Sequence, residues 1–329
     1  MSRLRVGCVG TGFIAGRHLK AMAEFPDVEI VAVADAARER AEDVAGRYGA
    51  AAYDDGLALL DSEELDAVWL CTPPFAHGPL EDAAVARGLP FFVEKPLTVD
   101  LERATGIADA VREKGLLTCV GYHWRSLSVV EQALEAVRGK QIQLVTGSWL
   151  DSTPPAPWWA QRSGSGGQLV EQTTHLFDLA RLLVGEVASV QALEQSSPRE
   201  AWPSADVPNA SVVLLRFRSG AVGTVASSCV LDKRREVALR LVTEGQLLDL
   251  RERALSDHEL RVSGTDGEQV VQTDEDPIAR EDRAFVDALT SGSGKVPVSY
   301  AEALRTHELV LAADRSAREG GTVVEIAEV

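Results

Sequence analysis

Lys95 occupies a position that is difficult to explain as ordinary surface charge. It follows the apolar run 90–93 as part of Glu94-Lys95-Pro96, and it is the only lysine within residues 21–113. A strand that ends here places an ammonium group, a carboxylate and a proline at the carboxyl edge of a sheet, where open α/β sheets bind ligands. A solvated charge at the start of a loop is the alternative interpretation. The lone lysine at the end of an apolar run favours a functional role.

A glycine-rich turn near the start of the chain predicts a nucleotide site. It follows the first predicted strand and opens a helix, and it reads Gly10, Thr11, Gly12, Phe13, Ile14 and Ala15. The first glycine permits a tight turn, and the second lets the backbone approach a pyrophosphate. The alanine permits close packing of helix against strand. Residues 10–14 are therefore candidate contacts of a dinucleotide.

An acidic residue, Asp35, ends the second predicted strand at the same edge of the sheet. Its carboxylate can accept hydrogen bonds from the 2′- and 3′-hydroxyls of a ribose, and it would repel a 2′-phosphate. The sequence therefore predicts NAD as the cofactor, and the nearby Arg38 leaves NADP use open. Asp35 can also cap the next helix, a role that is compatible with binding.

Two prolines end another strand and force a loop at this edge, in Thr72-Pro73-Pro74. We interpret Thr72 and Pro73 as cofactor contacts, because the threonine hydroxyl can hydrogen-bond a bound nucleotide. His77 can lie beside the cofactor as well. A helix-capping role explains His77 equally well from the sequence alone.

A second set of candidate groups lies in the middle of the chain. Glu171 and His175 are four residues apart and would share one face of a helix predicted over 169–183, with Asp178 near that face. The preceding Gly166-Gly167 permits a close approach to the start of this helix. A surface ion pair between Glu171 and His175 is the alternative interpretation.

Short alternating elements must position the first set of residues. Strand patterns occur at 4–9, 28–34, 67–71, 90–93 and 116–120, and helical patterns occur at 14–24, 37–48, 78–87 and 101–114. This alternation predicts a parallel sheet with right-handed crossovers, and the nearly continuous apolar strands indicate burial on both faces.

The rhythm of the sequence changes after Gly121. A helical pattern at 126–138 is followed by strand patterns at 141–150, 187–194, 211–217, 222–230, 236–243, 246–250 and 259–262, and by helices at 278–289 and 300–318. Ser219-Gly220 and Thr265-Asp266-Gly267 predict hairpin turns. We therefore expect an α/β chain with a dinucleotide-binding domain over 1–121. A substrate-binding α+β domain over 122–329 would contain a large, open, mainly antiparallel sheet.

The composition excludes several classes of protein. With a net charge of −17 over 329 residues, the chain lacks the basic surface that nucleic-acid binding requires. No stretch approaches the roughly 20 apolar residues of a membrane span. Four scattered cysteines without metal-ligand spacing indicate a reducing compartment and no metal site. Met1 leads into the first strand without a signal-peptide segment, and we expect a cytoplasmic protein.

Together these motifs resemble the Gfo/Idh/MocA oxidoreductase family, named for glucose–fructose oxidoreductase and inositol dehydrogenase. The resemblance covers nearly the whole chain, in the order 10–12, Thr72-Pro73 with His77, 94–96, 165–167 with His175 and Asp178, and Glu281, Phe285 and Ala288. It implies a Rossmann domain followed by an open-faced α/β domain whose sheet commonly builds oligomer interfaces, and hence a homodimer or homotetramer. The implied activity is hydride transfer between NAD(P) and a hydroxyl or carbonyl carbon of a sugar, polyol or cyclitol.

The resemblance also implies a role for each catalytic candidate. Oxidation of an alcohol requires a base for the hydroxyl proton, and His175 suits this role because an imidazole titrates near neutral pH. Lys95, which would contact both cofactor and substrate, would donate to the reacting oxygen and stabilise its alkoxide character. Glu94 would hold the cofactor's ribose or orient Lys95.

This chain departs from the family pattern in its central motif. The family carries Asp where this chain has Glu171, and Gly where it has Thr173. Because Glu is one methylene longer, the relay or substrate contact made by that Asp is open to change. Tyr122, Arg125 and Trp159 are further substrate candidates. One of the adjacent Trp158 and Trp159 can equally fill a core between the two domains. Three further histidines are interpreted as structural or surface residues: His18, His258 and His307.

Two other functions fit the same residues. One is a redox-neutral hydrolase or lyase, in which tightly held NAD oxidises a sugar carbon transiently and is then regenerated. The other is a non-catalytic NAD-binding regulator. The presence of both Lys95 and His175 argues against a regulator, and Glu171 argues weakly for one.

Overall fold

The computed structural model describes residues 3–265 and 267–327, so that Met1, Ser2 and the centre of the predicted turn at Asp266 lie outside the described residues. The chain forms two compact units. Unit 1 comprises Met1–His123 and Pro277–Leu304, and unit 2 comprises Trp124–Asp276 and Arg305–Val329. The sequence analysis had assigned 277–304 to the second domain, whereas the structure places this stretch in unit 1.

Unit 1 is built on a six-stranded sheet. In spatial order its strands are β3 (Ala51–Tyr53), β2 (Val28–Ala34), β1 (Leu4–Val9), β4 (Ala67–Leu70), β5 (Phe91–Val93) and β6 (Thr118–Val120). Every neighbouring pair is parallel, which confirms the predicted parallel sheet. All six strands therefore end at one edge. The strand order reverses at β1, and open α/β sheets bind ligands at such a reversal.

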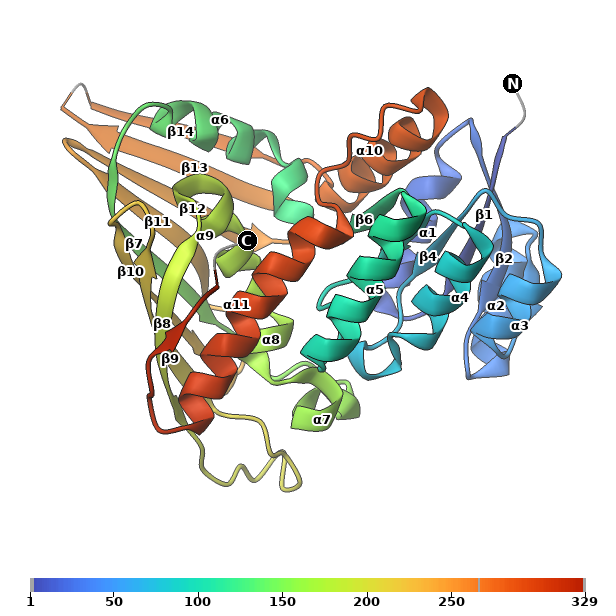
Figure 1. Ribbon diagram of the computed structural model, residues 1–329, viewed down its shortest axis with the longest axis horizontal. Helices are drawn as coiled ribbons and strands as arrows, with labels where there is room; N and C mark the ends of the chain where they lie inside the picture. The colour runs from blue at the N-terminus through green and yellow to red at the C-terminus, as the bar shows by residue number, and fades with distance from the viewer. Residues whose placement is uncertain (1–2, 266, 328–329) are drawn as a thin grey trace. The chain divides into compact units, whose positions relative to one another are not determined.

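Helices cover both faces of this sheet (Figure 1). They are α1 (Phe13–Ala23), α2 (Arg38–Tyr48), α3 (Gly56–Ser62), α4 (Pro79–Arg87), α5 (Leu101–Lys114), α10 (Pro277–Ser291) and the start of α11 (Tyr300–Arg318), with a short 3₁₀ turn η1 (Pro74–Ala76). The three-residue β3 and the short α3 were not predicted, because neither is long enough to show a clear period.

The returning stretch belongs to unit 1 because its aromatic residues complete both cores of the sheet. Trp69 and Phe92 point to one face, where they contact Phe285 of α10. Phe91 points to the other face, where its ring meets that of Tyr300 with centroids 6.0 Å apart. An amphipathic pattern shows that a helix has an apolar face, but it does not show which sheet that face covers.

Unit 2 is built on a nine-stranded sheet. In spatial order its strands are β14 (Gly267–Thr273), β13 (Asp257–Gly264), β12 (Gln246–Ala254), β11 (Glu236–Thr243), β7 (Ile142–Leu150), β10 (Val222–Ser228), β9 (Ala210–Phe217), β8 (Val187–Gln195) and β15 (Val324–Glu325). Among these pairs only β7 and β10 run parallel, which confirms a mainly antiparallel sheet. Strands β14 and β15 were not predicted.

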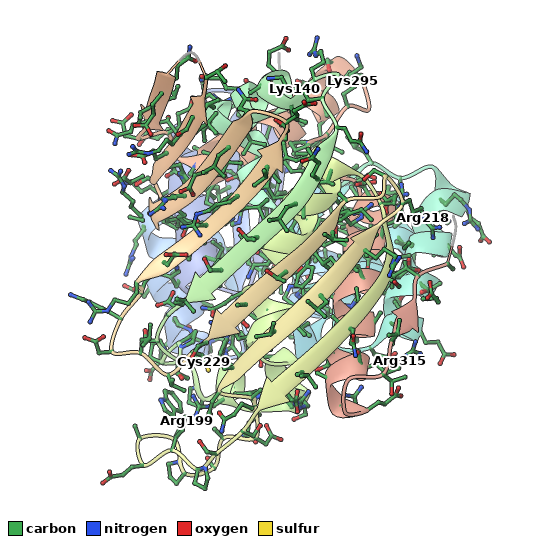
Figure 2. The ribbon with its side chains drawn as sticks, turned by 90° about the vertical axis from the view of Figure 1, so that its left-hand side faces the viewer. Lys140, Arg199, Arg218, Cys229, Lys295 and Arg315 are labelled. Atoms are coloured by element: carbon green, nitrogen blue, oxygen red, sulfur yellow. The ribbon has the colours of Figure 1, made fainter. Side chains whose placement is uncertain are left out.

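One face of this sheet is covered by helices and the other is open. The helical elements are α6 (Ser128–Val137), α7 (Arg162–Ser165), α8 (Gln168–Glu171), α9 (Thr174–Val184) and the rest of α11, with 3₁₀ turns η2 (His123–Ser126) and η3 (Pro157–Ala160). Figure 2 shows the open face, across which side chains project with no helix in front of them. Several exposed apolar residues alternate along its strands: Leu144, Val212, Leu214 and Val222.

Within residues 3–265 and 267–327, no helix combines the length and the apolar composition that crossing a membrane would require.

Candidate active-site residues in the two units

The glycine turn after β1 has the geometry of an anion cradle. Gly10 has a φ of +89°, and a Cβ there would lie 2.5 Å from the carbonyl oxygen of Cys71. Gly12 forms the N-cap of α1 without a side-chain cap, and nothing lies within 4 Å of the position its Cβ would take. The start of α1 therefore has open space beside Gly12, and backbone N–H groups at a helix start can hold a phosphate. Phe13 is 80% exposed beside them, and Ile14 is half-buried.

Asp35 is buried at the end of β2 and holds this turn in place. One oxygen accepts from the backbone N–H of Thr11 at 3.0 Å and from its hydroxyl at 2.7 Å. The other accepts from the backbone N–H of Ala37 at 2.9 Å and from Arg40 at 2.5 Å. Arg38 instead pairs with Glu42 on the exposed face of α2.

These hydrogen bonds determine the charge of the carboxyl group. Burial raises the pKa of Asp35, but the hydrogen bonds from Arg40, Ala37 and Thr11 outweigh it and lower the pKa from 3.8 to about 2. A carboxylate oxygen offers two lone pairs, and so these four donors occupy both oxygens fully. Arg40, whose side chain is 57% exposed, is the most accessible of the four partners.

The loop after β4 holds one predicted contact with an unused hydroxyl. Among the described residues, the buried Oγ1 of Thr72 has no hydrogen-bond partner. Because a buried hydroxyl without a partner is costly, this atom is suited to a ligand. Pro73, which precedes η1, is half-buried.

His77 ties this loop to the segment that follows β5. Its ring is buried, with Nδ1 2.8 Å from the carbonyl oxygen of Leu97 and Nε2 2.8 Å from that of Thr72. The cofactor contact expected of His77 stays a prediction, since main-chain oxygens occupy both ring nitrogens. The expected capping of α4 is carried out by Glu81, whose carboxylate accepts from the backbone N–H of Gly78 at 2.6 Å.

Lys95 lies at the carboxyl end of β5, as the sequence predicted, and it is the only residue of 91–98 that is not buried. The peptide bond that follows it, to Pro96, is cis. Its backbone N–H donates to Glu94 at 3.1 Å. The Glu94 carboxylate rests against Gly121, where a Cβ would lie 2.6 Å from Oε1. A side chain at residue 121 would therefore displace Glu94.

A buried histidine holds the other side of Glu94. The Nε2 atom of His18 lies 3.1 Å from Glu94 Oε1, and its Nδ1 lies 2.8 Å from Asp282 Oδ1. Trp69 also donates its indole N–H to that Asp282 oxygen at 2.8 Å. Burial alone would lower the pKa of His18, but the charges and hydrogen bonds of Asp282 and Glu94 raise it well above its usual value.

This arrangement keeps Glu94 ionised. Burial raises the pKa of Glu94, but the hydrogen bond and charge of His18 and the charges of Lys95 and His123 together lower it. His18 was interpreted as structural or surface, and it proves to be a buried partner of a candidate site residue. No local spacing indicated this, since its partners lie 76 and 264 residues away.

In unit 2, the helix predicted over 169–183 is interrupted after Glu171. It divides into α8 and α9, and His175 is the second residue of α9. The backbone N–H of Thr173 bonds the Gln168 carbonyl at 2.9 Å, and its hydroxyl donates to the same oxygen at 3.0 Å. Such a side-chain bond competes with the regular helical ladder. The premise that Glu171 and His175 share one continuous helical face is therefore wrong.

Glu171 and His175 each contact a tryptophan. Glu171 accepts a hydrogen bond from the indole N–H of Trp159 at 2.7 Å. The ring of His175 stacks on that of Trp149, with centroids 6.0 Å apart and 19° between the planes. Trp159 is only 1% exposed and packs in a small core with Val207 of the same unit. The stacking role of Trp149 was not predicted.

The remaining candidates are held by other protein groups. Arg125 grips Asp178 with two hydrogen bonds of 2.7 Å, and Asp178 also accepts from the Thr306 hydroxyl at 2.9 Å. Asp178 is thus bound to Arg125, which is itself nearly buried. In unit 1, Tyr122 is buried in the core that contains Tyr300. Substrate contacts by Arg125 and Tyr122 stay predictions.

Profiles of known families match both parts of the chain. The profile described as "Oxidoreductase family, NAD-binding Rossmann fold" matches residues 4–122. The profile described as "GFO/IDH/MocA C-terminal domain" matches residues 130–269. Together they cover most of the chain.

Individual proteins are similar over large parts of their length. Inositol 2-dehydrogenase of Rhizobium meliloti is 31% identical over 229 residues, covering 68% of each chain. Levoglucosan dehydrogenase of Pseudarthrobacter phenanthrenivorans is 29% identical over 266 residues, covering 69% of this chain and 68% of its own. A solved structure of levoglucosan dehydrogenase with NADH is 22% identical, covers both chains fully and gives a TM-score of 0.88, which shows a shared fold.

Replacing the Asp35 carboxylate should reduce the loss of stability in acid. The pKa of Asp35 is about 2 in the fold and near 3.8 without its partners. The ionised group therefore stabilises the fold above about pH 4, and this contribution disappears as the pH falls to about 2. Thermal unfolding of Asp35→Asn at about pH 6 and about pH 3 should give a smaller difference in midpoint than the wild type shows. Asp43→Asn on exposed α2 is the control, and equal differences in all three proteins would contradict this prediction.

Proposed function

The chain belongs to the Gfo/Idh/MocA oxidoreductase family, whose N-terminal part is an NAD-binding Rossmann fold, and on this premise we propose that it is an NAD-dependent dehydrogenase of a sugar, polyol or cyclitol. The observation that carries the proposal is the placement of Lys95. It follows β5 at the same edge of the unit 1 sheet as the glycine turn and the Thr72 hydroxyl, which has no hydrogen-bond partner within residues 3–265 and 267–327. The similarity to inositol and levoglucosan dehydrogenases supports this substrate class.

The cofactor would be held by the elements at the carboxyl edge of unit 1. The uncapped N–H groups of α1 suit a pyrophosphate. Asp35 suits the ribose hydroxyls, and we propose that they replace the exposed Arg40 as its hydrogen-bond partner. The fixed negative charge of Asp35 disfavours a 2′-phosphate, and so NAD is preferred over NADP.

The proposed reaction gives a catalytic role to Lys95 and another to His175. Bound NAD would supply the hydride acceptor. The ammonium of Lys95 donates a hydrogen bond to the reacting oxygen and stabilises its negative charge as its proton leaves. The imidazole of His175 accepts that proton as general base, and in the direction of reduction it returns the proton. Stacking on Trp149 fixes the plane of this imidazole.

Glu171 is proposed as a substrate contact of fixed orientation. The indole of Trp159 holds its Oε2 atom, so that the carboxylate cannot rotate freely about its extra methylene. A carboxylate oriented in this way can accept from a sugar hydroxyl. Trp159 therefore acts by positioning Glu171 rather than by laying its ring on a sugar.

The proposal includes assembly and location. We propose that the open face of the unit 2 sheet, with Leu144, Leu214 and Val222 exposed on it, forms the interface of a homodimer or homotetramer. The four cysteines are buried and free, which supports a reducing, cytoplasmic location.

Removing either catalytic group should abolish turnover without abolishing cofactor binding. A screen of sugars, polyols and inositols with NAD, followed by NADH absorbance, should identify a substrate. With that substrate, Lys95→Ala and His175→Ala should lower kcat by roughly 10²-fold or more. Their NAD dissociation constants, measured by fluorescence titration, should stay within about threefold of the wild type.

Three results would contradict these assignments. Loss of NAD binding in both variants would give Lys95 and His175 a different role. Cleavage of a glycoside without accumulation of NADH would indicate the redox-neutral hydrolase or lyase. Tight NAD binding with no turnover of any substrate would favour a regulator.

The Asp35 carboxylate should control cofactor preference. Asp35→Ala removes the acceptor for the ribose hydroxyls and the charge that repels a 2′-phosphate. We expect weaker binding of NAD and a smaller ratio of NAD affinity to NADP affinity, both measured by titration. Asp43→Ala serves as the control, and an unchanged ratio in Asp35→Ala would refute the assignment.

A charge on the open sheet face should weaken assembly. Leu214→Glu places a carboxylate in the middle of the proposed apolar interface, where burial without a partner is costly. Light scattering after size exclusion should show a smaller particle than the wild type. Leu57→Glu on exposed α3 is the control. If wild type and Leu214→Glu have the same mass, the interface lies elsewhere.

A further inference from the structure

Lys95 lies between two residues that are each hydrogen-bonded to a buried histidine. On one side, His18 bonds the carboxylate of Glu94. On the other, His77 bonds the carbonyl oxygen of Leu97. The two histidines come from α1 and from the loop before α4, and so separate elements grip the ends of one four-residue segment, 94–97.

The contact of His18 with Glu94 depends on an imidazole ring that donates from both of its nitrogens. Its acceptors are carboxylate oxygens of Glu94 and Asp282, at 3.1 and 2.8 Å. Burial raises the pKa of Asp282, whereas the charge and hydrogen bond of His18 lower it. With both carboxylates ionised, each can only accept, and both ring nitrogens of His18 then carry hydrogen. The resulting imidazolium compensates buried negative charge, and charge-assisted hydrogen bonds of this kind are among the stronger ones in proteins.

The hydrogen bond between His77 and Leu97 is comparable, but its acceptors are main-chain oxygens. Both ring nitrogens of His77 face main-chain carbonyl oxygens, of Leu97 and Thr72, and these also only accept. The Glu81 carboxylate lies 3.4 Å from Nδ1 and is itself fully buried. This carboxylate places a negative charge beside the ring in the protein interior.

A metal ion is a poorer explanation of the cluster around His18. Ligand atoms of His18, Glu94 and Glu281 lie within 4.8 Å of one another, which is close enough for a shared cation. A ring that donates from both nitrogens, however, has no lone pair left to coordinate a metal. The two hydrogen bonds of His18 therefore account for the arrangement as a positioning device.

We propose that His18 and His77 are positioning residues that hold segment 94–97 from its two ends and thereby fix Lys95 for the reaction. This inference rests on the proposed function, because it takes Lys95 to be the group that contacts the reacting oxygen. Neither histidine needs to touch the substrate. Displacing a catalytic group by about 1 Å can cost about 10²-fold in rate, and so loss of either grip should lower kcat more than cofactor affinity.

The test begins with single variants of each histidine. His77→Phe and His18→Gln should lower kcat by about tenfold or more, while the NAD dissociation constant stays within about threefold of the wild type. His77→Gln keeps a side-chain N–H donor and should recover part of the lost kcat. The matched control is His258→Phe, which changes an equally buried histidine in β13 of unit 2 and should leave kcat unchanged.

A double-mutant cycle separates positioning from general structural damage. In the Lys95→Ala enzyme, the added His77→Phe change should alter the residual rate by less than about twofold, because the group it positions is already gone. Hydrogen exchange of the peptide covering 90–98 provides a readout independent of residual activity. Exchange should accelerate in His18→Gln and His77→Phe and stay unchanged in His258→Phe.

The outcomes distinguish this inference from the proposed function. If Lys95→Ala retains full turnover, the proposed role of Lys95 fails, whatever the histidine variants do. If Lys95→Ala is inactive but the histidine variants keep both wild-type kcat and wild-type exchange, the positioning inference is overturned. It is also overturned if His77→Phe slows the wild type and the Lys95→Ala enzyme by the same factor.

Discussion

A buried histidine between two carboxyl groups connects three distant parts of unit 1. His18 from α1 bridges Glu94 at the end of β5 and Asp282 from α10. Removing one partner of such a buried set leaves an uncompensated charge and typically costs about 3–5 kcal/mol. The bridge therefore does more than join neighbours. It fixes α10, which follows the unit 2 stretch Trp124–Asp276 in the sequence, against the end of β5 that precedes Lys95.

The parts of the fold that follow from local pattern were predictable. Strands β1 and β2 have the predicted bounds, because each is a largely apolar run that stops at a clear end signal, Gly10 or Asp35. The glycine turn and Asp35 were found for the same reason, since their spacing is set by the strand and helix that flank them. The sequence could not predict that α10 belongs to unit 1. Phe285 and Trp69 are far apart in the sequence and contact each other only in the folded structure.

The candidate site shows the same division between local and distant information. Lys95, Glu171 and His175 stand out through residue type and spacing, whereas the partners that orient them do not. At the break between α8 and α9, the backbone N–H and the hydroxyl of Thr173 both bond the Gln168 carbonyl, whereas the helical pattern of the sequence continues across it undisturbed. His18 looks like any polar residue of an amphipathic helix, because its two acceptors lie far away in the sequence.

The two-stretch construction of unit 1 has a consequence for how the chain acquires its structure during synthesis. A nascent chain that has reached His123 contains all six strands of the first sheet but lacks both Phe285 and Tyr300, which complete its two cores. Trp69 and Phe92 would then lack their aromatic cover, and His18 would have only one of its two carboxylates. The N-terminal unit can thus reach its final packing only after the ribosome has passed residue 304, when most of unit 2 has already emerged.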